Sequence, residues 1–150
     1  MKKIKSILPP TYFLIILIFL IIFYFVFPIE RFIFPPFNYL GSIFILFGLI
    51  LNLWTDSLLK KNKTTVKPFI LPTKLITKGP FKISRHPIYL GMSIILFGTA
   101  IICGTWIAFI FPIIFMILME ILFISREERN LINIFKDDYK KYKNKTRRWL

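Results

Sequence analysis

The chain has 150 residues, enough for one domain, and 56% of them are apolar, above the roughly 45–50% of ordinary soluble domains. Phenylalanine alone occurs 18 times, and the long runs of Phe, Ile and Leu are more than a soluble fold of this size can bury all round. The net charge of +14 would suit nucleic acid, but the basic residues gather between the apolar runs instead of along one amphipathic face. The one cysteine lies in an apolar run and indicates neither a disulfide nor a thiolate metal site. We therefore predict an integral membrane protein with no nucleic-acid partner and no metal.

The first two apolar runs, 12–27 and 37–59, both have the length of membrane spans. The first follows a basic leader, but its apolar core is longer than the roughly 7–15 residues of a signal peptide, and no small-residue cleavage site follows. We interpret it as an uncleaved span that ends at Pro28. The second carries Gly41 and Gly48 seven residues apart, on one helix face that a neighbouring helix can approach closely.

Two further apolar runs, 88–103 and 106–124, are separated only by Gly104 and Thr105, which leave room for a tight turn. They should form an antiparallel helical hairpin. The third run is short for a span, and the fourth contains Pro112, which predicts a kink.

Basic residues mark the orientation of these spans. The connection 60–87 holds many lysines and Arg85 with no acidic residue, whereas the connection after the first run has only Glu30 and Arg31. Because cytoplasmic loops accumulate Lys and Arg, we expect this connection and both chain ends to be cytosolic, with the basic face against anionic lipids.

The tail, 125–150, turns polar, and Leu131, Phe135, Tyr139 and Tyr142 recur in it at helical spacing among basic residues. This pattern predicts an amphipathic helix that lies against the membrane, with the two tyrosines as interfacial anchors. The expected fold is therefore all-α: one membrane domain over 1–150, a bundle of about four transmembrane helices with a C-terminal helical hairpin, and a cytosolic amphipathic helix.

Polar residues collect at the cytosolic ends of the third and fourth runs. The sequence GPFKISRHPIYLG, 79–91, precedes and begins the third run, and Arg-Glu-Glu-Arg, 126–129, ends the fourth. A hairpin brings these two segments together. Pro87 suits the first turn of a helix, whose free amide groups and positive end favour an anion.

The ordered set of motifs resembles the family of isoprenylcysteine carboxyl methyltransferases and phospholipid methyltransferases. The resemblance comprises TTVKPF, GPF-x-x-SRHP-x-Y-x-G, the hairpin, the Glu-Glu pair and F-x-x-x-Y-x-x-Y, and it covers about 60–150. The first two runs are similar only in hydropathy. Lys136 stands where many relatives have Gly, and no extra substrate domain is expected after Trp149.

The resemblance implies a membrane methyltransferase that uses S-adenosylmethionine. Arg85 and the helix amides can hold the carboxylate of this cofactor, and either Glu of the pair can accept hydrogen bonds from its ribose or ammonium group. Arg85 and Glu127 are expected to act in catalysis. A dry, weakly polar site lowers the barrier to transfer from a sulfonium, and no residue need be a nucleophile. The implied cofactor-binding residues are Gly79, Arg85, His86, Pro87, Tyr89, Gly91, Glu127 and Glu128.

Glu120 lies inside the fourth apolar run, where an ionisable group is costly and indicates a function or a buried partner. Seven residues separate it from Glu127, so a continuous helix would place both on one face. Glu120 either lines the route of the acceptor or is a protonated or hydrogen-bonded structural group.

The methyl acceptor stays open among an isoprenylcysteine-like carboxylate, a phospholipid amine and a small hydrophobic thiol, and so does the oligomeric state. Two other functions are a noncatalytic membrane scaffold or carrier subunit, and a sterol-reductase-like oxidoreductase, for which 150 residues are few. Arg85 can also be a simple positive-inside charge, and His86 a structural hydrogen-bonding residue. The expected location is a prokaryotic cell membrane.

Overall fold

The computed structural model describes residues 8–27, 30–64 and 72–150, and all regular secondary structure in these ranges is helical. The basic leader, Pro28 and most of the TTVKPF sequence lie outside the described residues. Apolar composition on all sides is expected of helices that face lipid. Four such helices are α1 (Pro9–Val26), α2 (Leu40–Lys61), α3 (Pro87–Cys103) and α4 (Ile110–Met119).

The predicted spans are confirmed as helices, with ends that differ by a few residues. In the described ranges α1, α2 with its leading 3₁₀ turn η1 (Phe37–Tyr39), and the continuous helix from Trp106 are long and apolar enough to cross a membrane. α3 is a shorter apolar helix of 17 residues. The protein is therefore an integral membrane protein built as a helical bundle.

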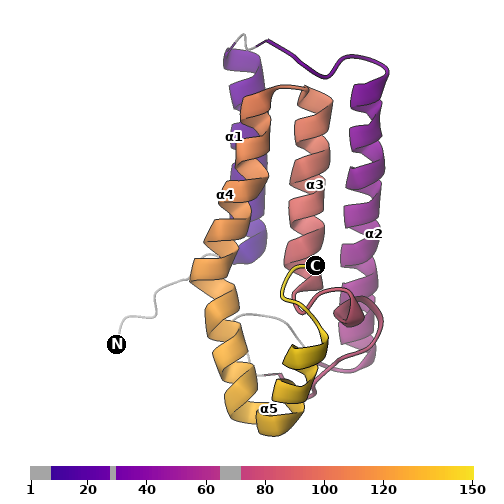
Figure 1. Ribbon diagram of the computed structural model, residues 1–150, viewed down its shortest axis with the longest axis vertical. Helices are drawn as coiled ribbons and strands as arrows, with labels where there is room; N and C mark the ends of the chain where they lie inside the picture. Colours follow the sequence, from indigo (N-terminus) through magenta and orange to yellow (C-terminus); the bar gives the residue numbers. More distant parts are fainter. Residues whose placement is uncertain (1–7, 28–29, 65–71) are drawn as a thin grey trace.

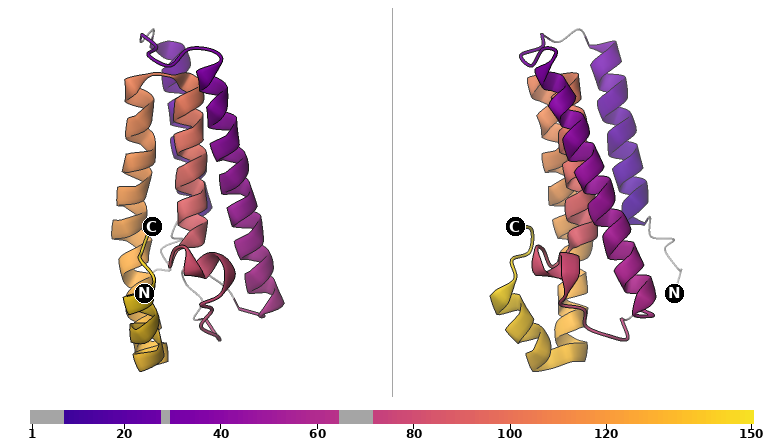
Figure 2. Two further views of the ribbon diagram at one scale, coloured as in Figure 1. Left: turned by 45° about the vertical axis from the view of Figure 1, so that its right-hand side comes forward. Right: turned by 90° about the vertical axis from the view of Figure 1, so that its right-hand side faces the viewer.

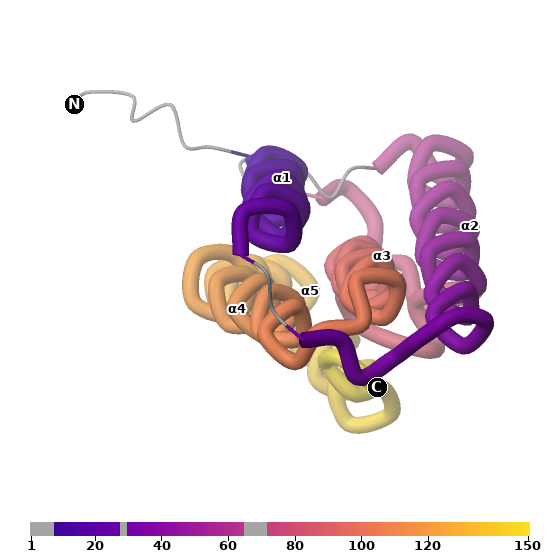
Figure 3. The backbone as a smooth tube through the Cα atoms, turned by 90° about the horizontal axis from the view of Figure 1, so that it is seen from above, coloured from indigo at the N-terminus to yellow at the C-terminus, as the bar shows by residue number. Residues whose placement is uncertain are grey.

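α3 occupies the middle of the bundle. Seen along the helices, it lies between α2 and α4, and α1 packs against α4 and α3 (Figure 1, Figure 3). Its central position explains why α3 is mostly buried. α1 fully buries Pro9, Ile16 and Leu20 and packs Tyr12, Phe13 and Leu17 partly against the core, while many of its other side chains are exposed to lipid.

The closest helix contact joins α2 and α3. Gly41 faces the carbonyl oxygen of Gly98, and Gly48 faces that of Gly91, so closely that an added Cβ atom would lie 2.2 Å and 2.6 Å from these oxygens. The two glycines share one face of α2, as predicted, and the facing positions on α3 are also small residues, Gly98 and Gly91. Only such residues let two backbones approach this closely.

The predicted hairpin is formed by α3 and α4. Gly104 ends α3, and a 3₁₀ turn, η3 (Trp106–Phe109), leads into α4. A kink was predicted at Pro112. Pro112 instead lies in the first turn of α4, where its missing amide breaks no helical hydrogen bond and the helix does not have to bend. The irregular turn comes later, as a π-helical segment, η4 (Glu120–Ile124).

α5 (Ser125–Lys145) continues the same helix away from the bundle and then reverses at Lys136, which has φ 45° and ψ −115° (Figure 1). The predicted continuous helix lying against the membrane is thus broken in two. Tyr139 and Tyr142 are 1% and 7% exposed and pack with Leu59 and Phe81. Their predicted role as interfacial anchors is wrong, because the reversal of the chain directs both side chains toward a core inside the protein.

One end of the bundle gathers the polar segments. The beginnings of α1 and α3, the end of α2, the loop with the 3₁₀ turn η2 (Gly79–Lys82), and all of α5 lie there (Figure 2). The connections after α1 and α3 lie at the opposite end. The predicted grouping of the motif segments at one level of the membrane is therefore present in the fold.

Candidate functional site

The loop before α3 has a fixed conformation. Gly79 has φ 61°, a left-handed value that glycine adopts without strain, and it lies against Trp54 and Leu58 of α2. Phe81 is buried, and its carbonyl oxygen accepts a hydrogen bond of 2.6 Å from the hydroxyl of Tyr142. The loop is thus held between α2 and α5.

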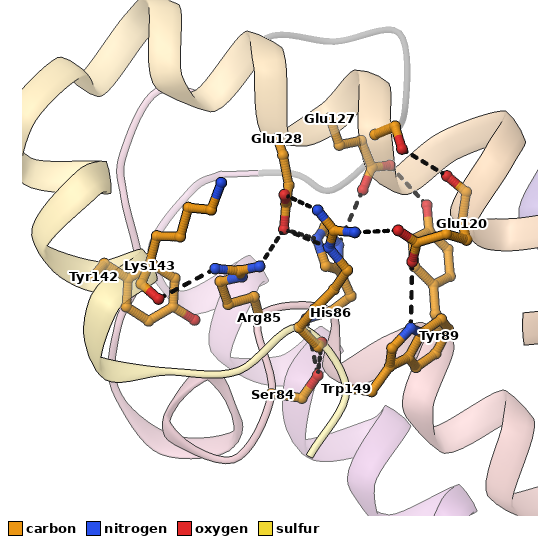
Figure 4. Close-up of polar contacts among 12 residues, drawn as sticks. Ser84, Arg85, His86, Tyr89, Glu120, Glu127, Glu128, Tyr142, Lys143 and Trp149 are labelled. Carbon is orange, nitrogen blue, oxygen red and sulfur yellow. Dashed lines mark hydrogen bonds and ion pairs between the residues drawn. The ribbon is translucent and has the colours of Figure 1, made fainter.

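The loop presents two polar side chains to the start of α5. The Arg85 side chain is 7% exposed, and its Nη2 lies 2.8 Å from Glu128 Oε1 (Figure 4). Its Nη1 donates to the carbonyl oxygen of Lys143 at 3.3 Å, near the negative end of α5. His86 places Nδ1 3.4 Å from Glu127 Oε2 and Nε2 3.5 Å from Glu128 Oε1.

Glu128 is the most enclosed carboxylate of the site. It is 4% exposed and also binds Arg148, which donates from Nη2 at 2.5 Å and from Nε at 3.1 Å. A buried carboxylate between two guanidinium groups is compensated in charge and in hydrogen bonds. Both carboxylate oxygens of Glu128 are therefore already bound by side chains of the protein.

Glu127 has different surroundings. Its Oε1 accepts a hydrogen bond of 2.7 Å from the hydroxyl of Tyr89, and its Oε2 lies 3.4 Å from Nδ1 of His86 (Figure 4). Its side chain is 17% exposed, against 5% for Glu128. Of the two adjacent carboxylates, Glu127 is the one that a ligand can reach.

The surroundings shift the pKa values of two of these groups. Burial alone would lower the pKa of His86, but its contacts with Glu127 and Glu128 outweigh burial and raise this pKa above 6.5. Burial alone would raise the pKa of Glu128, whereas the contacts with His86, Arg148 and Arg85 outweigh it and lower this pKa to about 2. Glu128 is thus ionised at neutral pH, and His86 keeps its proton to a higher pH than a free histidine.

A cavity of about 220 Å³ opens beside this cluster. Its walls come from the beginning of α1, from the loop before α3, from the first turns of α3 and from α5. Most of the wall is apolar, and the polar side chains gather on one side of it. The apolar lining residues are Leu8, Pro9, Pro10, Phe81, Pro87, Ile88 and Met92, and the polar ones are Arg85, His86, Tyr89 and Glu127.

Two polar atoms of the lining residues have no hydrogen-bond partner among the described residues. Arg85 Nε and His86 Nε2 are both buried and make no hydrogen bond, although His86 Nε2 lies 3.5 Å from Glu128 Oε1. Such groups are rare in folded proteins and are expected to bind water or a ligand. A carboxylate-bearing ligand with hydroxyl or ammonium groups suits this donor and acceptor set, because it can pair with Arg85 and Glu127 together. Within the described ranges, no group of three or more His, Cys, Asp or Glu side chains is arranged to hold a metal ion.

The predicted site residues divide into two groups. The hairpin brings together Arg85, His86, Pro87, Tyr89, Glu127 and Glu128, as the motif positions predicted. Gly79 and Gly91 instead face α2, where an added Cβ of Gly91 would lie 2.2 Å from Asn52 Oδ1. Their contacts give them a packing role, and the cofactor-binding role of all eight residues stays a prediction.

The sequence interpretation missed Arg148 and Trp149. Both lie on the segment after α5 and reach back to Glu120: the Arg148 guanidinium binds its Oε1, and Trp149 Nε1 donates to Oε2 at 3.3 Å. No local pattern marks these residues, since their partners lie 20 to 29 positions earlier in the chain. Glu120 is not among the lining residues of the described cavity.

Two comparisons with known proteins give matches. A protein of Haemophilus influenzae, described only as uncharacterized, is 39% identical over 62 residues, which are 41% of this chain and 98% of that protein. The model of the phospholipid methyltransferase family matches residues 37–138. The match covers α2, α3, α4 and most of α5, and so extends further toward the start of the chain than the motif resemblance.

The family match spans well over half of the chain and includes the loop before α3 and the Glu-Glu pair. Its members are membrane methyltransferases that act on lipophilic substrates. The chain belongs to the phospholipid methyltransferase family.

Proposed function

We propose that the protein transfers a methyl group from S-adenosylmethionine to a lipophilic acceptor at the cytosolic face of the membrane. The observation that carries the proposal is the polar side of the cavity, where Arg85, His86 and Glu127 meet an apolar wall. The family match supports methyl transfer, and the local chemistry supports this donor.

The polar residues suit the separate parts of such a cofactor. Arg85 can pair with its carboxylate, and the first amides of α3 have no carbonyl partner within the helix and favour the same negative charge. Glu127 can accept hydrogen bonds from the ammonium group or the ribose hydroxyls. The cavity of about 220 Å³ is smaller than the roughly 300–1,000 Å³ typical of ligand sites, so it holds only part of the cofactor.

When bound, S-adenosylmethionine supplies an electrophilic methyl group on a sulfonium. The apolar wall formed by Pro87, Ile88 and Met92 excludes water from the space beside it. A dry wall favours a reaction in which charge on the reactant disappears. No side chain of the chain needs to act as a nucleophile, and holding two reactants in line can supply much of the rate.

The acceptor should enter along the apolar side of the cavity, which the beginning of α1 completes with Leu8 and Pro10. An amine or thiol acceptor must lose a proton during methylation. Glu127 is the neighbouring carboxylate that can take this proton at the polar side, and His86 lies 3.4 Å from it. A carboxylate acceptor would need no such step.

The placement of charge supports the proposed cytosolic orientation. The end of the bundle that carries the cavity includes Lys60 and Lys61, which end α2, and Lys74 and Lys78, which precede η2. The connection from α1 to α2, at the other end, has Glu30 and Arg31. Because Lys and Arg are retained in the cytosol during insertion, the site should face the cytosol together with both chain ends. The same basic end should bind anionic lipids.

Binding measurements on the purified protein in lipid nanodiscs test the proposal. S-adenosylhomocysteine and a reduced nicotinamide are titrated separately into the wild type and into Glu127→Gln. Arg129→Gln, which changes an exposed residue of the same helix, is the control. The proposal expects binding of S-adenosylhomocysteine to wild type and control, with affinity reduced by roughly 10-fold or more in Glu127→Gln.

A second measurement identifies the acceptor. The protein is incubated with native membrane lipids and methyl-labelled S-adenosylmethionine, and the labelled product is identified.

In the binding measurement, absence of S-adenosylhomocysteine binding would exclude the proposed function and favour a noncatalytic scaffold or carrier subunit. Binding of the nicotinamide alone would favour an oxidoreductase.

A further inference from the structure

Glu120 has the most unusual position of any carboxylate in the described chain. It starts the π-helical segment within the long apolar helix, and its side chain is 31% exposed. Its partners are Arg148 and Trp149, which come from the segment 146–150 and not from a neighbouring membrane helix. A carboxylate in an apolar helix needs partners of this kind to remain charged.

The π segment determines which residues share a face with Glu120. A π turn holds about one residue more than an α turn, so it delays every later residue by about one position around the helix. On a regular helix, Glu120 and Glu127 would share a face. With the π turn, the residue that shares the face is Glu128, and Arg148 accordingly binds both Glu120 and Glu128. The predicted shared face of Glu120 and Glu127 is therefore wrong.

The segment that carries Arg148 also holds the loop before α3. The backbone N–H of Arg85 donates to the carbonyl oxygen of Arg147 at 3.1 Å, and the Ser84 hydroxyl donates to that of Arg148 at 2.7 Å. The Ser84 hydroxyl in turn accepts a hydrogen bond of 3.1 Å from the backbone N–H of His86. A continuous chain of contacts thus runs from Glu120 through Arg148 to the loop that presents Arg85 and His86 to the cavity.

We propose that Glu120 is a positioning residue, which anchors Arg148 on the membrane helix and thereby fixes the 84–86 loop in the conformation that binds the methyl donor. The inference rests on the proposed function. It gives Glu120 no contact with the acceptor, in contrast to a role in lining the acceptor route. It also makes the segment 146–150 a structural part of the site.

The test uses full-length protein in nanodiscs and compares Glu120→Gln, Arg148→Gln and the double variant. Asp137→Asn is the matched control, because it removes the same charge from an exposed residue of α5. Affinity for S-adenosylhomocysteine should fall about 10-fold in Glu120→Gln and at least as much in Arg148→Gln, which also loses the pair with Glu128. The double variant should lose no more than Arg148→Gln, since the contact with Glu120 is already broken there. The choice among acceptors should not change.

Amide hydrogen exchange of the ligand-free protein gives a second measurement that does not depend on the proposed function. The Arg85 amide, which bonds to Arg147, should exchange faster in Glu120→Gln, while the Ile83 amide, which bonds within the loop to Pro80, should not. Arg148→Lys keeps the positive charge and should therefore retain part of the protection of the Arg85 amide that Arg148→Gln loses.

Additive losses of affinity in the double variant would overturn the inference, as would unchanged exchange at Arg85. An altered acceptor choice with normal donor affinity would overturn it in favour of the route role. If the wild type does not bind S-adenosylhomocysteine, the proposed function fails, and the exchange of the Arg85 amide still decides whether Glu120 positions the loop.

Discussion

Glu127→Gln and Glu128→Gln remove the same charge from adjacent residues that have different surroundings. Glu128 is 4% exposed and binds Arg85 and Arg148. Removing one partner of a buried ion pair lowers the free energy of unfolding by about 3–5 kcal/mol, because the remaining charges stay buried without compensation. The lowered pKa gives a similar figure, since a shift from 4.5 to about 2 corresponds to roughly 3 kcal/mol.

Glutamine at position 127 should cost much less stability. The Glu127 side chain is 17% exposed, and a glutamine can still accept the hydrogen bond from Tyr89. We expect a loss of about 1 kcal/mol in the free energy of unfolding. Loss of a charged hydrogen bond to the ligand should cost about 1.5–3 kcal/mol, which is roughly a 10- to 100-fold loss of affinity.

Thermal unfolding in detergent and titration with S-adenosylhomocysteine measure the two effects on the same samples. The unfolding temperature should fall by roughly 10 °C in Glu128→Gln and by only a few degrees in Glu127→Gln. Equal losses of stability in the two variants would refute the assignment of Glu128 to structure and Glu127 to the ligand. So would a loss of affinity in Glu128→Gln with an unchanged unfolding temperature.

Lys136→Gly should raise the free energy of unfolding by about 1 kcal/mol in a denaturant titration, because glycine adopts φ 45° without strain, whereas Lys140→Gly, in regular helix, should lower it. Gly48→Val should destabilise the protein by about 1–3 kcal/mol in the same assay, since the new Cβ meets a carbonyl oxygen at 2.6 Å. A cysteine at Lys63 should be protected from an impermeant thiol reagent in sealed cells, and labelling from outside would reverse the topology. Because the pKa of His86 is raised in the folded state, protonated His86 stabilises the protein fully below pH 6.5, and this contribution is lost as the pH rises through the folded-state pKa. The unfolding temperature should therefore fall over that range in wild type, and less in His86→Gln.

The spans and the meeting of the two motif segments could be predicted because both depend on short-range properties of the sequence. Hydropathy marks the helices, and the two residues between the third and fourth runs permit only a hairpin. The hairpin then places Arg85 beside Glu128 without any further information. The spacing of Gly41 and Gly48 in the same way predicted a face of close approach on α2, and the structure identifies α3 as the neighbour.

The remaining features depend on long-range contacts or on backbone geometry that no periodicity reveals. The reversal at Lys136 has no glycine to mark it, so the helical spacing of Tyr139 and Tyr142 suggested one continuous helix. The π turn at Glu120 changes the register by about one residue, a shift that counting at 3.6 residues per turn cannot detect. The role of Arg148 depends on both features, because the reversal returns it to the π turn.

Helix geometry gives the two carboxylates of the Glu-Glu pair different roles. Adjacent residues on an α-helix point about 100° apart, so Glu127 and Glu128 point in different directions, although His86 lies within 3.5 Å of both. If both carboxylates were bound by arginine, no acceptor group would remain at the cavity wall. If neither were, the buried Arg85 would lose its compensating charge, and the loop would lose the contact that joins it to α5. An ammonium or hydroxyl group entering the cavity can bind Glu127 without breaking an arginine pair, whereas binding Glu128 requires one to break. The ligand should therefore select Glu127, and the neighbouring carboxylate keeps the loop in place while it does so.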